Sequence, residues 1–373
     1  MGTVPGGDIP RSDVDPIAHT FAGAALATAG LRRATPLATA ALLIGSNIPD
    51  VDVFASLGGS FAALALRRGW THGVLALAIW PFIVTGGLLL FDRWRRSRQA
   101  QGPPPHPGRL LIIAAIAVLG HPTLDWLNNY GLRWLMPFDG RWFYGDALFI
   151  VDPWVWLMLG GVVFLAHSET RGSQAAWMVF WVASSILLLT VPEPPARMVW
   201  SVGLLGLLLM RFWARPGPRR IELGARIALA GIASYMITAV SLNGPARAQV
   251  QRELDAAALG PIHDVMLGPI PADPLGAAVV AETATEYLLG HWHWLAEPRF
   301  LLDEETIVKR LHEPAVQAAM DHPEVRDFMI WARYPYAEIE TGTNGELSVH
   351  FRDARYFDNR RLWGPSVQLK ALD

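Results

Sequence analysis

The chain has 373 residues, of which 52% are hydrophobic and only 17% are charged, whereas an average soluble chain has about 25% charged residues. This balance excludes a disordered protein, a nucleic-acid-binding protein that depends on a basic surface, and an ordinary cytosolic enzyme. The chain has no cysteine, so disulfides, thiol catalysis and cysteine-ligated zinc sites are excluded as well. The net charge of −2 says little, but the basic residues are 29 Arg and only 2 Lys.

Apolar segments follow one another along the first 243 residues. Three of them carry no charge over 17 to 19 residues, which is close to the roughly 20 residues that a membrane-spanning helix needs. In chain order the segments are Thr20–Leu31, Ala34–Pro49, Gly73–Phe91, Leu110–Gly120, Pro153–Ala166, Gln174–Pro192, Met198–Met210 and Ile227–Asn243. The first is either a span or a short helix packed inside the protein. The pattern predicts a mainly α, polytopic membrane helix bundle of about eight segments.

The charge density changes near Asn243. Residues 1–243 carry 19 basic and 13 acidic residues, whereas residues 244–373 carry 12 basic and 20 acidic residues in about half the length. We therefore expect a membrane-embedded domain over 1–243 and a soluble α+β domain over 244–373. In the second domain the sequence predicts a helix at Asp303–Met320, a hairpin turn at Thr343–Gly345, and strands at Ala277–Leu289, Leu295–Leu302, Phe328–Ile339 and Glu346–Phe351.

The distribution of arginine predicts an orientation. If the eight segments alternate in direction, 13 basic residues of the membrane domain lie on one side and 6 on the other. The positive-inside rule assigns the side with 13 to the cytoplasm. The N-terminus and the whole of residues 244–373 are then expected to be extracytoplasmic.

Histidine and aspartate side chains gather at the outer ends of the segments under this topology. Neutral imidazoles and carboxylates together are typical of zinc and dimetal sites. Single residues among them have plainer interpretations, since His19 and His72 are alternatively hydrogen-bonded residues at the membrane interface. The candidate metal ligands are His19, Asp50, Asp52, His72, His121 and Asp125.

Two spacings bear on this site. His121 and Asp125 are four residues apart in Gly-His-Pro-Thr-Leu-Asp, so on a helix they lie on one face, one turn apart, and share a metal. Asp50 and Asp52 in Ile-Pro-Asp-Val-Asp point the same way only in an extended segment. Asp50 follows Pro49 and is alternatively a helix cap.

These motifs resemble the YdjM/YfhP-type family of bacterial membrane-bound proteins, usually described as metal-dependent hydrolases. That family usually reads His-Arg-Gly-x-Thr-His-Ser, and here Arg67 stands at the first position and Gly73 at the last, which puts the role of the first His in doubt. There is a looser likeness to zinc-dependent phospholipases C. The segments that carry the family resemblance are His19 with its small-residue helix, Ile48–Asp52, Arg67–Gly73, Gly120–Asp125, Asn129–Gly131, Leu135–Phe138, Asp152–Trp154 and, more vaguely, Ala354–Tyr356 and Val367–Leu369.

The resemblance implies a multi-pass protein of the bacterial inner membrane that holds one or two divalent ions, zinc first. Asp125 and Asp50 are the best-placed carboxylates for bridging two ions and for catalysis, together with Arg68. Asp146 and Asp152 are possible additional ligands, although Asp152 before Pro153 is alternatively a helix cap.

The expected activity is hydrolysis of a phosphoester in a lipid or lipid-linked substrate. Arg67, Arg68 and Arg133 either pair with phosphate oxygens or anchor the protein to lipid headgroups. Asn128, Asn129 and Tyr130 either orient the substrate or only form the turn that ends a helix. The expected partners are membrane lipids and such a substrate, not nucleic acid.

Two other functions compete with this one. In the first, the protein is not catalytic, the metal holds helix ends together and the outer domain binds a partner. In the second it is a transporter, but transporters place ionisable groups near mid-membrane, and these segments hold almost none. The motifs of zincin proteases, Gly-x-Ser-x-Gly hydrolases and phosphate-binding loops are absent from the sequence.

Overall fold

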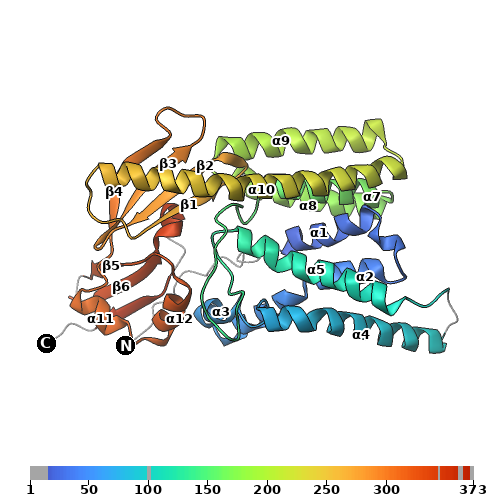
Figure 1. Ribbon diagram of the computed structural model, residues 1–373, viewed down its shortest axis with the longest axis horizontal. Coiled ribbons are helices and arrows are strands. Elements are labelled where there is room, and N and C mark those ends of the chain that lie inside the picture. The colour runs from blue at the N-terminus through green and yellow to red at the C-terminus, as the bar shows by residue number, and fades with distance from the viewer. Residues whose placement is uncertain (1–15, 99–101, 343–344, 360–363, 370–373) are drawn as a thin grey trace.

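The computed structural model describes residues 16–98, 102–342, 345–359 and 364–369. All eight apolar segments form helices that lie along the long axis of the molecule, and the β domain lies at one end of this bundle (Figure 1). The helices are α1 (Pro16–Thr28), α2 (Ala38–Gly45), α4 (Val74–Arg98), α5 (Pro107–Leu127), α6 (Pro153–Val155) continued by a π-helical turn η3 (Trp156–Gly160) and α7 (Gly161–His167), α8 (Arg171–Leu189), α9 (Pro194–Leu209) with the π-helical η4 (Met210–Ala214), and α10 (Pro218–Ala256).

Six helices in the described part of the chain are long and apolar enough to cross a membrane, which is fewer than the predicted eight or so. Helix α1 has only 13 residues, or about 20 Å at 1.5 Å per residue, against an apolar core of about 30 Å. The helical stretch Pro153–His167 is also too short. The six are Ala38–Gly58, Val74–Arg98, Pro107–Leu127, Arg171–Leu189, Pro194–Ala214 and Pro218–Ala256.

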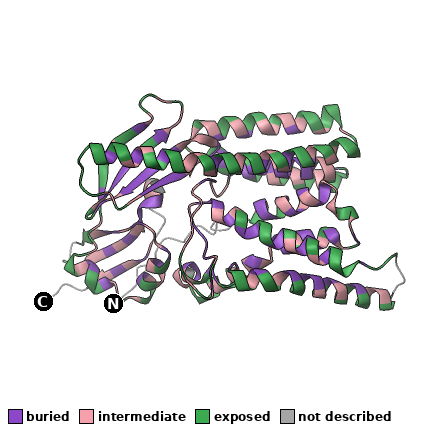
Figure 2. Ribbon diagram, in the orientation of Figure 1, coloured by how far each residue is buried: buried purple, intermediate pink, exposed green. Residues whose placement is uncertain are grey.

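Helix α1 joins two groups of helices. On one side, Gly23 lets it pack closely against α2, because a Cβ there would lie only 2.8 Å from the Leu42 carbonyl oxygen. On the other side, Phe21 packs into an aromatic core with Trp156 and Trp181 that α7 to α10 share. Figure 2 shows the buried residues along the facing sides of these helices. Because α1 is enclosed, its His19 is held inside the protein and not in lipid.

The two ends of the bundle differ in chemistry. At the end away from the β domain, Arg33 pairs with Glu222 at 2.6 Å, and Arg96 and Arg211 bind nearby backbone carbonyls. At the other end, α5 ends and α4 begins beside two short elements, the 3₁₀ helix η2 (Ile48–Gly58) and α3 (Ser60–Leu66). The arginine-rich end and the end with the candidate ligands are therefore opposite.

The C-terminal part contains two antiparallel sheets. Strands β1 (Asp264–Ile270), β2 (Asp273–Glu282), β3 (Glu286–His293) and β4 (Phe300–Val308) pair in chain order, as do β5 (Pro335–Thr341), β6 (Leu347–Asp353) and β7 (Ser366–Leu369). Two short helices, α11 (Pro314–Ala319) and α12 (Pro323–Trp331), lie between the sheets in the chain, and the 3₁₀ turn η5 (Ala354–Asn359) follows β6.

Four element predictions in this part differ from the structure. The predicted strand Ala277–Leu289 is the end of β2, a turn and the start of β3, and the predicted strand Leu295–Leu302 begins as a turn, since β4 starts only at Phe300.

The predicted helix Asp303–Met320 begins as β4, and only its end is helical, because Pro314 starts a new helix there. The predicted strand Phe328–Ile339 begins as the end of α12, and the strand starts only at Pro335. Part of the predicted hairpin turn, residues 343–344, lies outside the described residues.

The two parts of the chain share their cores. Helix α10 has 39 residues, about 58 Å, and its Val250 and Leu254 pack under β1 and β2. Leu64 of α3 and Tyr130 belong to the same buried cluster as Phe328 of α12. The charge change near Asn243 therefore falls inside a continuous helix, and loops of the helical part are built into the β domain.

Candidate metal centre

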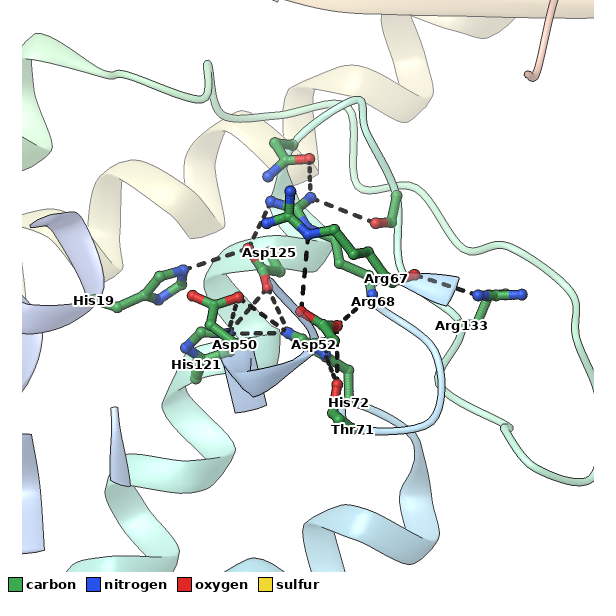
Figure 3. Close-up of polar contacts among 12 residues, drawn as sticks. His19, Asp50, Asp52, Arg67, Arg68, Thr71, His72, His121, Asp125 and Arg133 are labelled. Carbon is green, nitrogen blue, oxygen red and sulfur yellow. Dashed lines mark hydrogen bonds and ion pairs between the residues drawn. The ribbon is translucent and has the colours of Figure 1, made fainter. Parts of the chain in front are cut away.

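Four buried or nearly buried side chains meet at the domain end of the bundle (Figure 3). Asp50 comes from η2, His72 precedes α4, and His121 and Asp125 occupy successive turns of α5. The two imidazole Nε2 atoms are 3.1 Å apart, and each lies 3.2 Å from Asp125 Oδ2. Asp50 Oδ1 lies 3.7 Å from His72 Nε2 and 3.5 Å from His121 Nε2.

These separations fit one tetrahedrally coordinated ion. Metal–ligand bonds of about 2.0–2.2 Å place the ligand atoms of a tetrahedral site about 3.3–3.6 Å from one another. The five measured separations run from 3.1 to 3.7 Å. Both carboxylate oxygens of Asp50 and Oδ2 of Asp125 are buried and have no hydrogen-bond partner among the described residues. Buried carboxylate oxygens without partners are costly, and a cation bound among them removes that cost.

The hydrogen bonds behind each histidine set its tautomer. His121 Nδ1 lies 2.8 Å from the Ser46 carbonyl, so it donates and leaves the lone pair on Nε2. His72 Nδ1 lies 2.8 Å from Thr71 Oγ1 and 3.3 Å from Asp52 Oδ2. Such partners orient metal-binding histidines in proteins. Two lone pairs therefore face the same point, which is the arrangement a metal ion requires.

Asp52 and His19, both candidate ligands from the sequence, lie outside this four-residue group. Asp52 Oδ2 accepts hydrogen bonds from Thr71 Oγ1 and from the Arg68 backbone, so this carboxylate supports His72 from behind. His19 Nε2 lies 3.4 Å from Asp125 Oδ1, and its ring stacks on His121 with centroids 3.8 Å apart. His19 therefore contacts the far oxygen of a candidate ligand.

The comparison with protein families covers the part of the chain that holds this site. Residues 14–193, which include all four candidate ligands, match the model described as YdjM inner membrane protein. Through these residues, slightly less than half of its length, the chain resembles the YdjM family. It is also 27% identical over 117 residues to the uncharacterized protein YfhP of Bacillus subtilis (strain 168). That match spans 31% of this chain and 33% of YfhP. No solved structure matches.

Arg68 links the YdjM-family motif to the carboxylates. Its backbone has a φ of 52°, a region that non-glycine residues rarely adopt, and hydrogen bonds to Asp52 and Arg133 hold it there. Its side chain is 1% exposed and reaches Asp125 Oδ1 at 2.8 Å and Asn128 Oδ1 at 2.9 Å. Strained residues held this firmly are frequent at functional sites.

Arg67 replaces the first histidine of the family pattern. Its side chain is buried, and its Nε lies 3.8 Å from Asp52 Oδ1. In the described part of the chain, its Nε and Nη2 have no hydrogen-bond partner. Figure 3 shows Arg67 and Arg68 beside each other above the acidic group. Arg133 lies behind them and donates to the backbone carbonyls of Ala65 and Arg67.

The possible additional ligands lie elsewhere. Asp146 forms an ion pair with Arg333 of the β domain at 2.8 Å. Asp152 accepts hydrogen bonds from Trp154 N and Val155 N and so caps α6, the alternative that the sequence left open. Neither belongs to the four-residue group.

The predicted substrate-binding residues have structural partners. The Tyr130 ring lies between Arg68, 4.4 Å from its centroid, and Trp331 of α12, 5.1 Å away. The backbone carbonyl of Asn129 accepts from Arg355 Nη1 at 2.8 Å. Tyr130 therefore supports Arg68, and the Asn129 backbone joins the site to the β domain.

Arg355 was missed at the sequence level, and Asn128 was considered there only for orienting the substrate or ending a helix. Asn128 fixes Arg68, and Arg355 fixes the turn that carries Asn128. For Arg355 a signal existed, because Ala354–Tyr356 resembles the end of the family's C-terminal domain. For Asn128 only its position directly after the helix of His121 and Asp125 pointed to a role.

A small cavity of about 20 Å³ adjoins the four-residue group. His19, Arg68, Asp125 and Asn128 provide its polar lining, and Leu148 is among the apolar residues opposite them. One water needs about 10–15 Å³ of such volume. The cavity therefore has room for one water-sized group next to Asp125.

Proposed function

We propose that this protein is a membrane-bound metal-dependent hydrolase that acts on a phosphoester of a lipid or a lipid-linked molecule. The observation that carries the proposal is the four-residue group with tetrahedral spacing directly beside the buried Arg67 and Arg68. Burying a guanidinium such as that of Arg67, two of whose nitrogens have no hydrogen-bond partner among the described residues, is costly. A site that only bound a metal would not need such a group.

The charges around the group favour an anionic substrate. With neutral histidines, the residues labelled in Figure 3 include three carboxylates and three arginines, whose charges cancel. A divalent ion then adds two positive charges that nothing in this group balances. A phosphoester supplies the missing negative charge, and arginine is well suited to bind phosphate oxygens.

Zinc is the proposed ion, because two imidazole nitrogens and two carboxylates in a tetrahedral arrangement are typical of it. When bound, such an ion lowers the pKa of water and polarises a phosphoryl oxygen. We propose one ion and not two. The four-residue group provides ligands for one ion, and the remaining oxygen of Asp125, Oδ1, already pairs with the Arg68 guanidinium at 2.8 Å.

The remaining residues would handle protons and substrate. With Nε2–H directed at Asp125 Oδ1, His19 keeps an acceptor at Nδ1, which has no hydrogen-bond partner among the described residues. This is the form that takes a proton from a water in the adjoining cavity. Arg67 would bind a non-bridging phosphate oxygen, and Arg68 would hold Asp125 in place.

The hydrolase proposal is tested by assaying zinc-loaded protein in vesicles with p-nitrophenyl phosphate, bis-p-nitrophenyl phosphate and phosphatidic acid. Turnover by wild type that is lost in Asp125→Asn and in His19→Gln supports it. Full zinc content with no turnover of any phosphoester would contradict it.

Arg67 offers a more specific test. We expect Arg67→Gln to raise KM for the phosphoester by about tenfold or more, because a charge-assisted hydrogen bond contributes roughly 1.5–3 kcal/mol. Zinc affinity should stay close to that of wild type, since Arg67 is not a ligand. Arg141, which pairs with Asp139 at the surface, provides the matched control Arg141→Gln, whose KM should not change. Equal KM values for the two variants would exclude Arg67 from substrate binding.

We further propose that the β domain is extracytoplasmic. The arginine-rich end of the bundle lies opposite the β domain, as the positive-inside rule requires. An alkaline phosphatase reporter fused after Asp373 should be active, and a green fluorescent protein fused there and exported unfolded should be dark. The reverse pattern would place this domain, and the metal centre with it, in the cytoplasm.

A structural metal site is the second candidate, and one observation favours it. Closed sites with four protein ligands are typical of structural zinc, whereas catalytic zinc usually keeps one position open. A variant of Asp50 distinguishes a structural from a catalytic site, because the Asp50 oxygen lies farther from the histidine nitrogens than the Asp125 oxygen does. If Asp50→Ala retains zinc and turnover, three ligands are enough and the site is open. If Asp50→Ala unfolds with loss of zinc, the structural function is favoured.

A further inference from the structure

An apolar face of η2 lies uncovered by any described residue, directly beside the metal centre. A 3₁₀ helix has three residues per turn, so side chains three positions apart lie in one row. Val51, Phe54 and Leu57 form such a row, and Phe54 and Leu57 are 69% and 87% exposed. Asp52 leaves η2 on another side and binds Thr71. The helix therefore turns a polar side to the metal centre and an apolar side outward.

Two more exposed aromatic side chains lie in the segments next to the start of α4. Trp70 is 59% exposed and Phe138 is 79% exposed. The loop with Phe138 is held against the start of α4, where Val74 N donates to the Trp134 carbonyl at 2.8 Å. Gly73 permits this approach, because a Cβ there would lie 2.3 Å from a carbonyl oxygen of the loop. Glycine is thus required where the family pattern usually has serine.

Helix α4 itself carries exposed apolar side chains. Val74, Leu75, Ile79 and Phe82 of α4 are all exposed, as expected where a transmembrane helix meets lipid. The apolar part of α4, residues 74–91, is about 27 Å long at 1.5 Å per residue, close to the thickness of the apolar core. Its first residue therefore marks the lipid boundary, and Trp70, only four residues earlier, lies at that boundary.

We propose that the η2 row, together with Trp70 and Phe138, inserts into the boundary between headgroups and acyl chains of the adjacent leaflet. Amphipathic helices bind membranes in this way, with the apolar face about 5–10 Å deep, and tryptophan is enriched at this level. The bilayer is the occupant that fits, because η2 and the loop that carries Phe138 both contact α4, whose exposed apolar side faces lipid.

This contact has a consequence for the metal centre. Asp50 lies on the same helix as Phe54 and Leu57. The lipid that covers the apolar row therefore also holds one candidate ligand in place and sets the metal centre at the depth of the lipid phosphates.

The absence of cysteine makes the test direct. Leu57→Cys and Phe138→Cys are each spin-labelled in protein reconstituted into phosphatidylethanolamine–phosphatidylglycerol vesicles. Power saturation then compares collisions with oxygen, which dissolves in lipid, and with a water-soluble nickel complex. Phe82→Cys in α4 is the lipid-exposed control, and Glu304→Cys on β4 is the water-exposed control.

We expect both labels to give an oxygen-to-nickel ratio at least threefold above that of Glu304→Cys and below that of Phe82→Cys. A ratio equal to that of Glu304→Cys would overturn the proposal, because the row would then face water. Low accessibility to both reagents would also overturn it, since protein would then cover the row. The measurement needs neither zinc nor turnover, so its failure is distinct from failure of the proposed function.

Discussion

His121→Ala and Asp125→Asn should each lower zinc affinity by more than about 100-fold. Each change removes one of four candidate ligands, and loss of a residue that only orients a ligand already costs about 10–100-fold in affinity. Inductively coupled plasma mass spectrometry of the folded fraction measures the change as zinc per chain. Wild type should contain about one zinc and the two variants close to none.

A thermal melt provides an independent readout. Bound metal stabilises the folded state by about 4 kcal/mol when it is present at 1,000 times its Kd. Zinc should therefore raise the melting temperature of wild type but not of His121→Ala. His167→Ala is the matched control, because His167 ends α7 at the opposite end of the bundle and is exposed. Full zinc content in His121→Ala would disprove the metal centre itself.

The sequence was most informative where a spacing matched a periodic structure. The four-residue step from His121 to Asp125 predicted one helix face, and both side chains point to the same place on α5. The apolar segments also predicted the eight helices. The number of membrane-spanning helices was predicted less accurately. The length of a helix depends on tertiary contacts that the apolar pattern does not show, and α1 is too short to span.

The sequence could not show which of two nearby carboxylates faces the candidate metal centre. Asp50 and Asp52 are two residues apart, and only the 3₁₀ geometry of η2 separates a candidate ligand from a supporting carboxylate. Likewise, Arg355 lies more than 220 residues from the turn that it holds. Such long-range contacts follow from the packing of the β domain onto α3 and Tyr130, which no local pattern specifies.

Arg355→Gln is expected to destabilise the protein by about 3–5 kcal/mol. Arg355 is buried and donates to both carboxylate oxygens of Asp353 at 2.8 and 2.9 Å, and also to the backbone carbonyl of Asn129. Removing one partner of a buried ion pair leaves the other charge unpaired, and this costs about that much. The exposed pair of Arg141 and Asp139 is the control, and Arg141→Gln should cost less than about 1 kcal/mol. Thermal unfolding in nanodiscs compares the two.

The pH dependence of this pair has a definite sign. Burial raises the pKa of Asp353, but the charge and hydrogen bonds of Arg355 lower it by a larger amount. The pKa of Asp353 therefore lies below its usual value. The ionised carboxylate therefore stabilises the fold at neutral pH, and this contribution is lost as the pH falls below about 4. Asp353→Asn should accordingly be much less stable than wild type at pH 7 and approach it only in that acidic range.

The same contact reaches the metal centre, because Arg355 holds the turn from which Asn128 fixes Arg68. Arg355→Lys keeps the charge but not the planar set of donors, so it should restore part of the stability. It should not restore the zinc-induced rise in melting temperature to the wild-type value. If Arg355→Gln and Arg141→Gln unfold at the same temperature, or if Arg355→Gln keeps the full zinc effect, the β domain does not position Arg68.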